Sequence, residues 1–277
     1  MISDSQPAGP NSGAAGREMA MSVRRDLFDL TGRIAIVTGA ASGLGEAISY
    51  GLAAFGADVV AADVEPAGLG RVCENVKGMG RRALPVTCDV RSAEEIQSMV
   101  ARCMDTFGRI DVLVNNAGIS RRSLAEEMTR GQWDDVLAVD LTGPFLCCQE
   151  VGRVMIRQGR GRIINMASVG GIVGLKTGNA NYCAAKGGLI SMTRALALEW
   201  AKHNILVNAV APTHIRTPLI EALLEDAEKR AYFLGNVPLG RLGEVSEIVG
   251  PVVFLASDAA SLVTGTVLCV DGGHTAQ

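Results

Sequence analysis

A tyrosine and a lysine stand four residues apart at Tyr182 and Lys186, in the sequence Tyr-Cys-Ala-Ala-Lys, and a serine, Ser168, precedes them. If Tyr182 opens a helix, this spacing puts the phenol and the ammonium on one face, within mutual reach. A free phenol, with a pKa near about 10, is a poor base at neutral pH, and a fixed cation nearby favours the phenolate. The pattern therefore predicts a general acid/base at Tyr182 that is tuned by Lys186, with Ser168 holding a substrate oxygen beside it.

A glycine-rich segment, Thr38–Gly45, follows an apolar run and reads Thr-Gly-Ala-Ala-Ser-Gly-Leu-Gly. Glycine lets the backbone turn tightly and approach a pyrophosphate, and the start of a following helix offers free N–H groups and partial positive charge. Alone, such a segment is often only a turn, and a Tyr-x-x-x-Lys spacing alone is common on helix surfaces. Their joint occurrence favours a dinucleotide cofactor, bound in this turn by Gly39, Ser42, Gly43, Leu44 and Gly45.

An aspartate, Asp63, ends the second apolar run. A carboxylate at this position can accept hydrogen bonds from the 2′-hydroxyl of the adenosine ribose and would repel a 2′-phosphate. Neither Ser42 nor Val64 supplies a cation for such a phosphate, so NAD is favoured over NADP. The alternative is a solvated aspartate in a turn.

Polar residues also follow the third and fourth apolar runs. Asp89 and Val90 come after the third run, and Asn115 and Asn116 after the fourth. In a doubly wound sheet, ligands bind at the carboxyl ends of the strands. We therefore expect Asp89, Val90 and Asn116 beside the adenine and ribose, whereas Asn115 is expected to tie adjacent strands through backbone hydrogen bonds.

The elements that would position these residues alternate along the chain. Short β-branched runs predict strands, and continuous runs such as Ile-Ala-Ile-Val are typical of strands buried on both faces of a parallel sheet. The predicted strands are Arg33–Thr38, Asp58–Ala62, Ala83–Cys88, Asp111–Val114, Arg162–Met166, Ile205–Val210 and Thr266–Val270. The predicted helices include Glu46–Phe55, Ala93–Phe107, Asp135–Ile156, Tyr182–His203 and Val245–Ala256. This alternation predicts an α/β fold: a Rossmann-type doubly wound domain with a parallel sheet flanked by helices.

The composition narrows the class of protein. The chain has 277 residues, a net charge of -3 and 48% hydrophobic residues, which argues against a disordered chain and a nucleic-acid binder. We expect residues 1–28 to be a flexible extension and residues 29–277 to form one domain. The 7 scattered cysteines and 3 isolated histidines predict neither disulfides nor a metal site, and fit a reducing cytoplasm. No window is apolar enough to predict export or membrane insertion.

In order along the chain, these motifs resemble the short-chain dehydrogenase/reductase family over about Leu30 to Gly273. The matching pieces are Thr-Gly-x-x-x-Gly-x-Gly, Cys-Asp-Val, Asn-Asn-Ala-Gly, Ser168, Tyr-x-x-x-Lys, Ala-Pro with Arg-Thr-Pro, and Val-Asp-Gly-Gly. The resemblance implies a seven-stranded sheet and hydride transfer between nicotinamide C4 and an alcohol or carbonyl carbon. It also implies that Lys186 holds the nicotinamide ribose and that Ile215 and Thr217 pack against the carboxamide.

The sequence departs from the family pattern at two positions. Asp140 stands where the family often has an asparagine that anchors a water linked to Lys186, and we retain Asp140 as a candidate catalytic residue. If the backbone carbonyl does the anchoring, the substitution is tolerable; if the side chain is needed, the proton relay changes. Thr213 replaces the glycine that usually follows Pro212.

Within the family, the chain looks most like sugar-acid dehydrogenases that act on gluconate or deoxygluconate. Arg121 and Arg122 follow the fourth predicted strand, where a guanidinium could hold a substrate carboxylate through two hydrogen bonds. The alternative is an exposed loop whose cations face nearby glutamates. We expect residues 216–236 to form a lid, with a plain surface helix as the alternative. His214 stays outside the catalytic set because a single loop histidine is more often structural or solvated.

The main hypothesis is therefore a NAD-dependent dehydrogenase or reductase for a sugar acid or polyol. A second is a reductase of 3-oxoacyl thioesters, against which Asp63 argues because the expected cofactor there is NADPH. A third is a non-catalytic NAD-binding scaffold, which would be expected to have lost part of the Ser168, Tyr182 and Lys186 set. Family resemblance further implies a homotetramer, or a homodimer, with two-fold symmetry.

Overall fold

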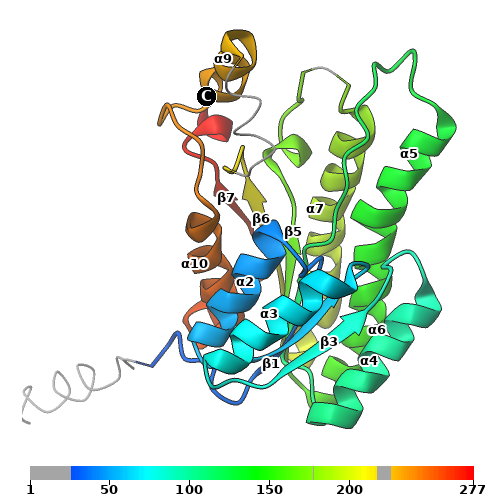
Figure 1. Cartoon of the computed structure of the whole chain (residues 1–277), viewed down its shortest axis with the longest axis vertical. Helices are drawn as coiled ribbons and strands as arrows, with labels where there is room; N and C mark the ends of the chain where they lie inside the picture. The colour runs from blue at the N-terminus through cyan, green and yellow to red at the C-terminus, as the bar shows by residue number, and fades with distance from the viewer. Residues whose placement is uncertain (1–25, 177, 217–225) are drawn as a thin grey trace, which may run out of the picture.

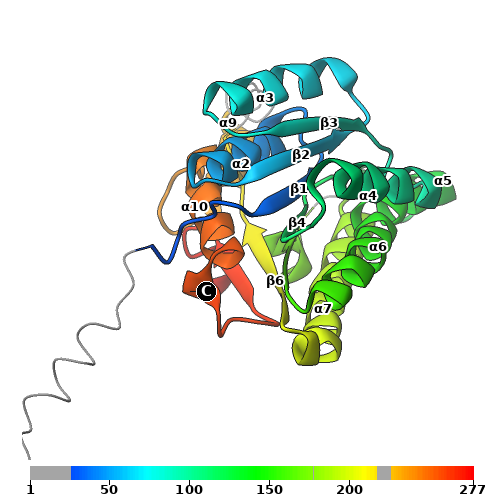
Figure 2. The ribbon, with the colours of Figure 1, turned by 90° about the horizontal axis from the view of Figure 1, so that it is seen from below.

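The computed structural model describes residues 26–176, 178–216 and 226–277. Its centre is a 7-stranded sheet in the order β3-β2-β1-β4-β5-β6-β7, and every pairing is parallel (Figures 1 and 2). The strands are β1 (Ile34–Thr38), β2 (Asp58–Asp63), β3 (Ala83–Thr87), β4 (Val112–Asn115), β5 (Gly161–Met166), β6 (Ile205–Pro212) and β7 (Val267–Val270). Because the strand order reverses between β1 and β4, the loops there diverge and leave a crevice at the carboxyl ends of the strands.

Helices cover both faces of the sheet, as Figure 2 shows from below. On one face α2 (Gly43–Ala54), α3 (Pro66–Gly78) and α10 (Val245–Ala256) pack over alternate strand residues such as Ala35 and Val37. On the other, α4 (Ala93–Phe107), α6 (Gly143–Gln158) and α7 (Ala180–Trp200) pack over Ile34 and Ile36. The strands are thus buried on both sides, which explains their continuous apolar runs and confirms the predicted doubly wound fold.

The predicted helix Asp135–Ile156 is wrong as a single element. The structure instead has α5 (Arg130–Leu137), a wide π turn η1 (Ala138–Thr142) and α6. Pro144, in the first turn of α6, has no N–H to donate to the carbonyl of Asp140. The Gly143 N–H donates to the carbonyl of Ala138, five residues before it, as is typical of a π turn. The interruption falls at Asp140, one of the candidate site residues. The helix α3 was not among those predicted, and α9 (Ala227–Gly235) lies within residues 216–236, where a surface helix was the alternative to a lid.

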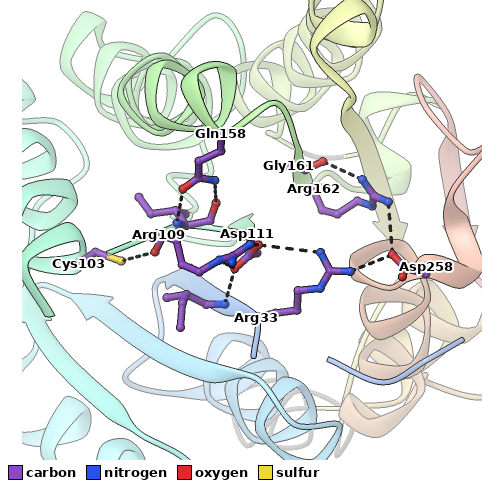
Figure 3. A network of polar contacts seen from close by, with 10 residues as sticks. Arg33, Cys103, Arg109, Asp111, Gln158, Gly161, Arg162 and Asp258 are labelled. Atoms are coloured by element: carbon purple, nitrogen blue, oxygen red, sulfur yellow. Dashed lines mark hydrogen bonds and ion pairs between the residues drawn. The ribbon is translucent and has the colours of Figure 1, made fainter. Parts of the chain in front are cut away.

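A polar network ties the amino ends of the strands together, opposite the glycine-rich turn (Figure 3). The buried Asp111 carboxylate accepts a hydrogen bond from the Ile34 N–H at 3.0 Å and pairs with Arg109 at 2.6 Å. Asp258, in the short turn η4 (Asp258–Ala260), lies 3.0 Å from Arg33 and 3.8 Å from Arg162. These contacts connect the starts of β1, β4 and β5 to the segment before β7. Among the described residues, no helix is long and apolar enough to cross a lipid bilayer.

Candidate active site

The glycine-rich turn after β1 has close contacts that only glycine allows. A Cβ at Gly45 would collide with the carbonyl oxygen of Gly39, and one at Gly39 would lie 2.9 Å from Asn116 Nδ2. Gly39 also has a φ of +65°, in the left-handed region. Ser42 flanks the start of α2 and makes no capping bond through its side chain. The turn thus brings tightly packed backbone and the start of a helix to one place, where N–H groups can meet an anionic ligand.

A cleft of about 450 Å³, here called the glycine-turn cleft, opens beside this turn. It is lined by seven of the predicted residues: Gly39, Ser42, Asp63, Asp89, Val90, Asn116 and Arg121. Asp63 accepts hydrogen bonds from the Ala41 N–H at 2.9 Å and from the Glu65 N–H at 3.1 Å. Its carboxylate therefore shapes the turn as well as facing the cleft. Hydrogen bonds from the Arg91 side chain lower the pKa of Asp89, which keeps this second carboxylate ionised.

Asn115 and Asn116 have different environments. Buried Asn115 donates to Asn165 Oδ1 at 2.8 Å, so it ties β4 to β5 as expected, but through side chains rather than the backbone. Asn116 donates from Nδ2 to the carbonyls of Thr38 and Gly39 at 2.9 and 3.0 Å. Asn116 thus holds the glycine-rich turn against β4, a structural task that its sequence position did not reveal.

A second cleft of about 460 Å³, here called the tyrosine cleft, adjoins the first, and Asn116, Gly118 and Ile119 line both. It brings together Ser168, Tyr182, Lys186, Asp140, Arg122, Leu44 and Ile215. The predicted reactive residues therefore lie in one hollow, next to the glycine-rich turn. Leu44 faces this cleft rather than the glycine-turn cleft.

Tyr182 and Lys186 share one face of the first turns of α7. The ammonium lies 5.6 Å from the centroid of the tyrosine ring, donates a hydrogen bond to the Met166 carbonyl at 2.9 Å, and is 3.1 Å from Asp140 Oδ2. Both Lys186 and Asp140 are buried. The cation is thus fixed beside the phenol by the end of β5 and by the π turn.

Asp140 connects this lysine to the loop that carries the two arginines. Its Oδ1 accepts the Ile119 N–H at 2.8 Å, whereas its Oδ2 lies 3.1 Å from the Lys186 ammonium. The carboxylate is fully buried, so its charge is balanced mainly by the lysine. An asparagine at this position could also accept from Ile119 but would leave the lysine without its counter-charge.

The segment after β5 holds Ser168 against α7. Ser168 Oγ accepts the Gly170 N–H at 3.1 Å, inside a short turn, η2 (Val169–Gly171). A Cβ at Gly171 would lie 2.7 Å from the backbone of Lys186. Because glycine permits this close approach, the serine and the tyrosine line the same cleft.

The structure separates the two arginines: Arg121 lines the glycine-turn cleft and Arg122 the tyrosine cleft. Ile215 is buried beside the tyrosine cleft, whereas Thr217 and much of the predicted lid lie outside the described residues. Leu175 and His214 also line the tyrosine cleft. Sequence analysis missed Leu175 because an apolar residue in a loop carries no signal of its own. It set His214 aside, although the adjoining Pro212 motif was a signal for its position.

Comparison with known proteins gives concordant results. A family model described as enoyl-(acyl carrier protein) reductase matches residues 39–275. A 2-dehydro-3-deoxy-D-gluconate 5-dehydrogenase of Escherichia coli is 41% identical, with 90% of this chain and 98% of that protein covered. A 3-oxoacyl-(acyl-carrier-protein) reductase of Thermotoga maritima is 43% identical, with 88% and 98% covered.

Solved structures show the same similarity. A gluconate 5-dehydrogenase from Burkholderia cenocepacia, solved in complex with NADP and tartrate, superimposes with a TM-score of 0.86 at 35% identity and covers 91% of this chain and 98% of its own.

Proposed function

The chain belongs to the short-chain dehydrogenase/reductase family, and from this premise we propose that it is a NAD-dependent oxidoreductase acting on a secondary alcohol or ketone of a sugar acid or polyol. The observation that carries the proposal is the adjacency of the two clefts. The tyrosine cleft contains Ser168, Tyr182 and Lys186, and it shares a wall with the cleft beside the glycine-rich turn.

The residues of the glycine-turn cleft fit a nicotinamide dinucleotide. Gly39 and Gly45 allow the turn to pack tightly against itself and Asn116, and the N-terminus of α2 offers N–H groups to a pyrophosphate. Asp63 and Asp89 suit the ribose and adenine end, and Lys186 and Ile215 the nicotinamide end. Thr217 completes the proposed set. When bound, the cofactor supplies or accepts the hydride at C4.

In the proposed reaction, Tyr182 moves the proton. Its phenolate oxygen accepts the hydroxyl proton of an alcohol during oxidation and returns it to the carbonyl oxygen during reduction. Ser168 orients that oxygen. Lys186, held by Met166 and Asp140, is assigned the task of keeping positive charge near the tyrosine ring during the proton transfer. Asp140 is assigned the task of fixing the lysine.

The preference for NAD is supported by the Asp63 carboxylate, which faces the glycine-turn cleft and would repel a 2′-phosphate. The B. cenocepacia relative was solved with NADP bound, so this preference is a property proposed for this chain. Titration of both cofactors, followed by fluorescence of Trp133 and Trp200, tests it. Tighter binding of NADP than of NAD would overturn the assignment.

An acidic substrate is supported by Arg122, whose position in the tyrosine cleft lets its guanidinium meet a carboxylate. Arg121 lies in the other cleft, where it is assigned to the boundary between cofactor and substrate. A second candidate function is reduction of 3-oxoacyl thioesters. It is favoured by the T. maritima relative, which has a similar identity and coverage.

The decisive experiment is a screen of NAD reduction against aldonates, deoxy-aldonates, polyols and simple secondary alcohols, with 3-oxoacyl thioesters in the reverse direction. We expect the highest kcat/KM for an aldonate or polyol. Arg122→Ala should then raise KM for an acid far more than for a polyol of the same length, and Arg121→Ala is the matched control. Thioesters as the best substrates would reject the sugar-acid proposal and establish the second candidate.

Two further properties complete the proposal. Leu198 on α7 and Phe145 on α6 are 83% and 43% exposed, which supports assembly into a homotetramer or homodimer through these helices. A single-chain mass in sedimentation equilibrium would reject it. The 7 cysteines are free and 5 of them are buried, which fits a cytoplasmic setting. Fractionation of cells tests the location.

A further inference from the structure

Two hollows meet at the far side of the candidate active site. One is the tyrosine cleft of about 460 Å³, and the other is a smaller pocket of about 180 Å³, here called the outer pocket. The outer pocket is lined by residues 173–176, Asn236, His274, Gln277 and His214. Among the residues that the structure describes, Leu175 and His214 are the two that line both hollows. Their side chains therefore form the wall between the tyrosine cleft and the outer pocket.

The histidine side of this wall is held by the C-terminal part of the chain. The His214 ring meets the buried Phe233 ring edge-on at a centroid distance of 4.8 Å and lies 6.1 Å from His274. His274 is fixed by a 2.8 Å hydrogen bond with the Thr213 hydroxyl. Ring packing from two sides leaves little freedom for His214 to turn out of the way.

The leucine side of the wall is held by the segment that carries the catalytic serine. A Cβ at Gly170 would lie 2.7 Å from Leu175 Cδ1, so the leucine side chain rests directly on this glycine. Gly170 is the residue whose N–H bonds Ser168 Oγ. Leu175 is thus linked through Gly170 to Ser168, the residue proposed to orient the reacting oxygen.

The wall carries no charge at neutral pH. Burial, with contributions from His274 and Arg122, lowers the pKa of His214 to about 4. The ring is then neutral at neutral pH, and the cations that line the tyrosine cleft are Arg122 and Lys186. A neutral aromatic ring and an aliphatic side chain restrict the length of a ligand without attracting a carboxylate.

We propose that His214 and Leu175 set the length of the substrate, by ending the tyrosine cleft so that a compact substrate fits and a longer homologue meets the wall. This inference rests on the proposed function, because it needs an alcohol or ketone whose reacting oxygen lies at Ser168 and Tyr182. It adds that specificity is imposed from the end of the cleft that adjoins the C-terminal residues.

The test compares kcat/KM along a homologous series, built on the best substrate of the screen and extended by one to three carbons at the end remote from the reacting carbon. His214→Ala and Leu175→Ala each join the two hollows. Each should raise kcat/KM for the longest homologue, relative to the parent substrate, by at least about tenfold. His214→Phe keeps the wall with a ring of similar size and should leave the ratio within about threefold.

A second variant asks whether the added carbons enter the outer pocket. Gly174 lines that pocket, and a Cβ built there meets no atom within 4 Å. Gly174→Leu, combined with His214→Ala, should therefore fill the pocket and abolish the gain for long homologues. A gain that survives this substitution would place the added carbons elsewhere and overturn the inference.

The outcomes separate the two proposals. If the unchanged protein turns over no member of the screen, the proposed function is rejected and the length inference falls with it. If it turns over the parent substrate but both alanine variants keep the original length profile, the inference alone is wrong. Should an alanine variant fail to fold, His214→Asn and Leu175→Val replace it, because they remove fewer atoms from the same wall. If both of these variants keep the original length profile, the inference is wrong.

Discussion

At the scale of single residues, the proposed chemistry depends on the Tyr182 phenol and the ammonium fixed near its ring. Lys186 Nζ lies 5.6 Å from the centre of the tyrosine ring, and the ring lines the same cleft as Ser168. Tyr182→Phe keeps the ring and removes the proton carrier. We expect kcat to fall by about 10²-fold or more, with the affinity for the dinucleotide kept within about threefold. Stopped-flow turnover and cofactor titration measure the two quantities, and undiminished kcat would remove Tyr182 from the mechanism.

Asp140 contributes through Lys186 and Ile119, so two substitutions can separate its contacts. Asp140→Ala leaves the buried ammonium unpaired and should lower the free energy of unfolding by about 3–5 kcal/mol. Asp140→Asn keeps an acceptor for the Ile119 N–H and should lose less. Urea unfolding measures both values.

Measurements of kcat separate a role of Asp140 in positioning Lys186 from a role in stability alone. If Asp140 fixes the catalytic lysine, Asp140→Asn should change kcat at saturating substrate, whereas the KM for substrate should move little. Equal kcat in the folded Asp140→Asn variant and the unchanged protein would make Asp140 a structural residue.

The cofactor preference proposed above rests on the Asp63 carboxylate. Asp63→Asn keeps an oxygen to accept the Ala41 N–H and removes the negative charge. Because like charges oppose binding, we expect the ratio of kcat/KM for NADP to that for NAD to rise by at least about tenfold. Asp89→Asn, in the same cleft, is the control and should affect both cofactors alike. A ratio unmoved by Asp63→Asn would show that this carboxylate only shapes the turn.

At the scale of elements, the polar network of Asp111 and Asp258 connects the starts of three strands at the end of the sheet remote from the clefts (Figure 3). The buried Asp111 carboxylate serves the Ile34 N–H and the Arg109 guanidinium. Asp111→Ala should lower the free energy of unfolding by about 3–5 kcal/mol, since it orphans a buried N–H and a partly buried cation. Asp134→Ala breaks an exposed pair with Arg130 and should cost less than about 1 kcal/mol. Chemical denaturation gives both, and equal losses would refute the role of the network.

Elements that are determined by their own local sequence were predicted well, and those that depend on other contacts were not. Strands such as Ile34–Thr38 are short, apolar and bounded by turn residues, so periodicity located them within a residue or two. The prediction of one continuous helix over Asp135–Ile156 was wrong because the π turn arises from Pro144 and from packing around Asp140, and a helical hydrophobic pattern continues across it. The periodicity of a sequence does not indicate where a helix changes from α-type to π-type backbone hydrogen bonds.

At the scale of the whole molecule, the sequence predicted which motifs gather at one edge of the sheet, but not the contacts that their side chains make. The order was enough to predict that Ser168, Tyr182 and Lys186 gather at one edge of a doubly wound sheet. It did not show that Asn116 holds the glycine-rich turn, that Arg121 and Arg122 face different clefts, or that Leu175 and His214 share a wall. Those facts depend on side-chain directions in loops, which are set by packing among segments distant in sequence.

The stability of the whole fold should fall in mild acid, and His214 sets part of that fall. Its pKa is about 4 in the folded protein, mainly through burial, whereas a histidine in an unfolded chain titrates near about 6.5. Between these values the unfolded chain binds a proton that the folded protein does not, so stability decreases as the pH falls through this window. Carboxylates act at lower pH: burial alone would raise the pKa of Asp58, but hydrogen bonds from Arg82 overcome it and lower that pKa.

His214→Phe therefore has a distinct signature. The variant has no group to protonate at this position, so the decrease in unfolding free energy from pH 7 to pH 4.5 should shrink by on the order of 2 kcal/mol. Urea unfolding at the two pH values measures it. If the unfolding free energy decreases equally in His214→Phe and in the unchanged protein, His214 is protonated equally in the folded and unfolded chains. The His214 ring would then not form a neutral wall in the folded protein.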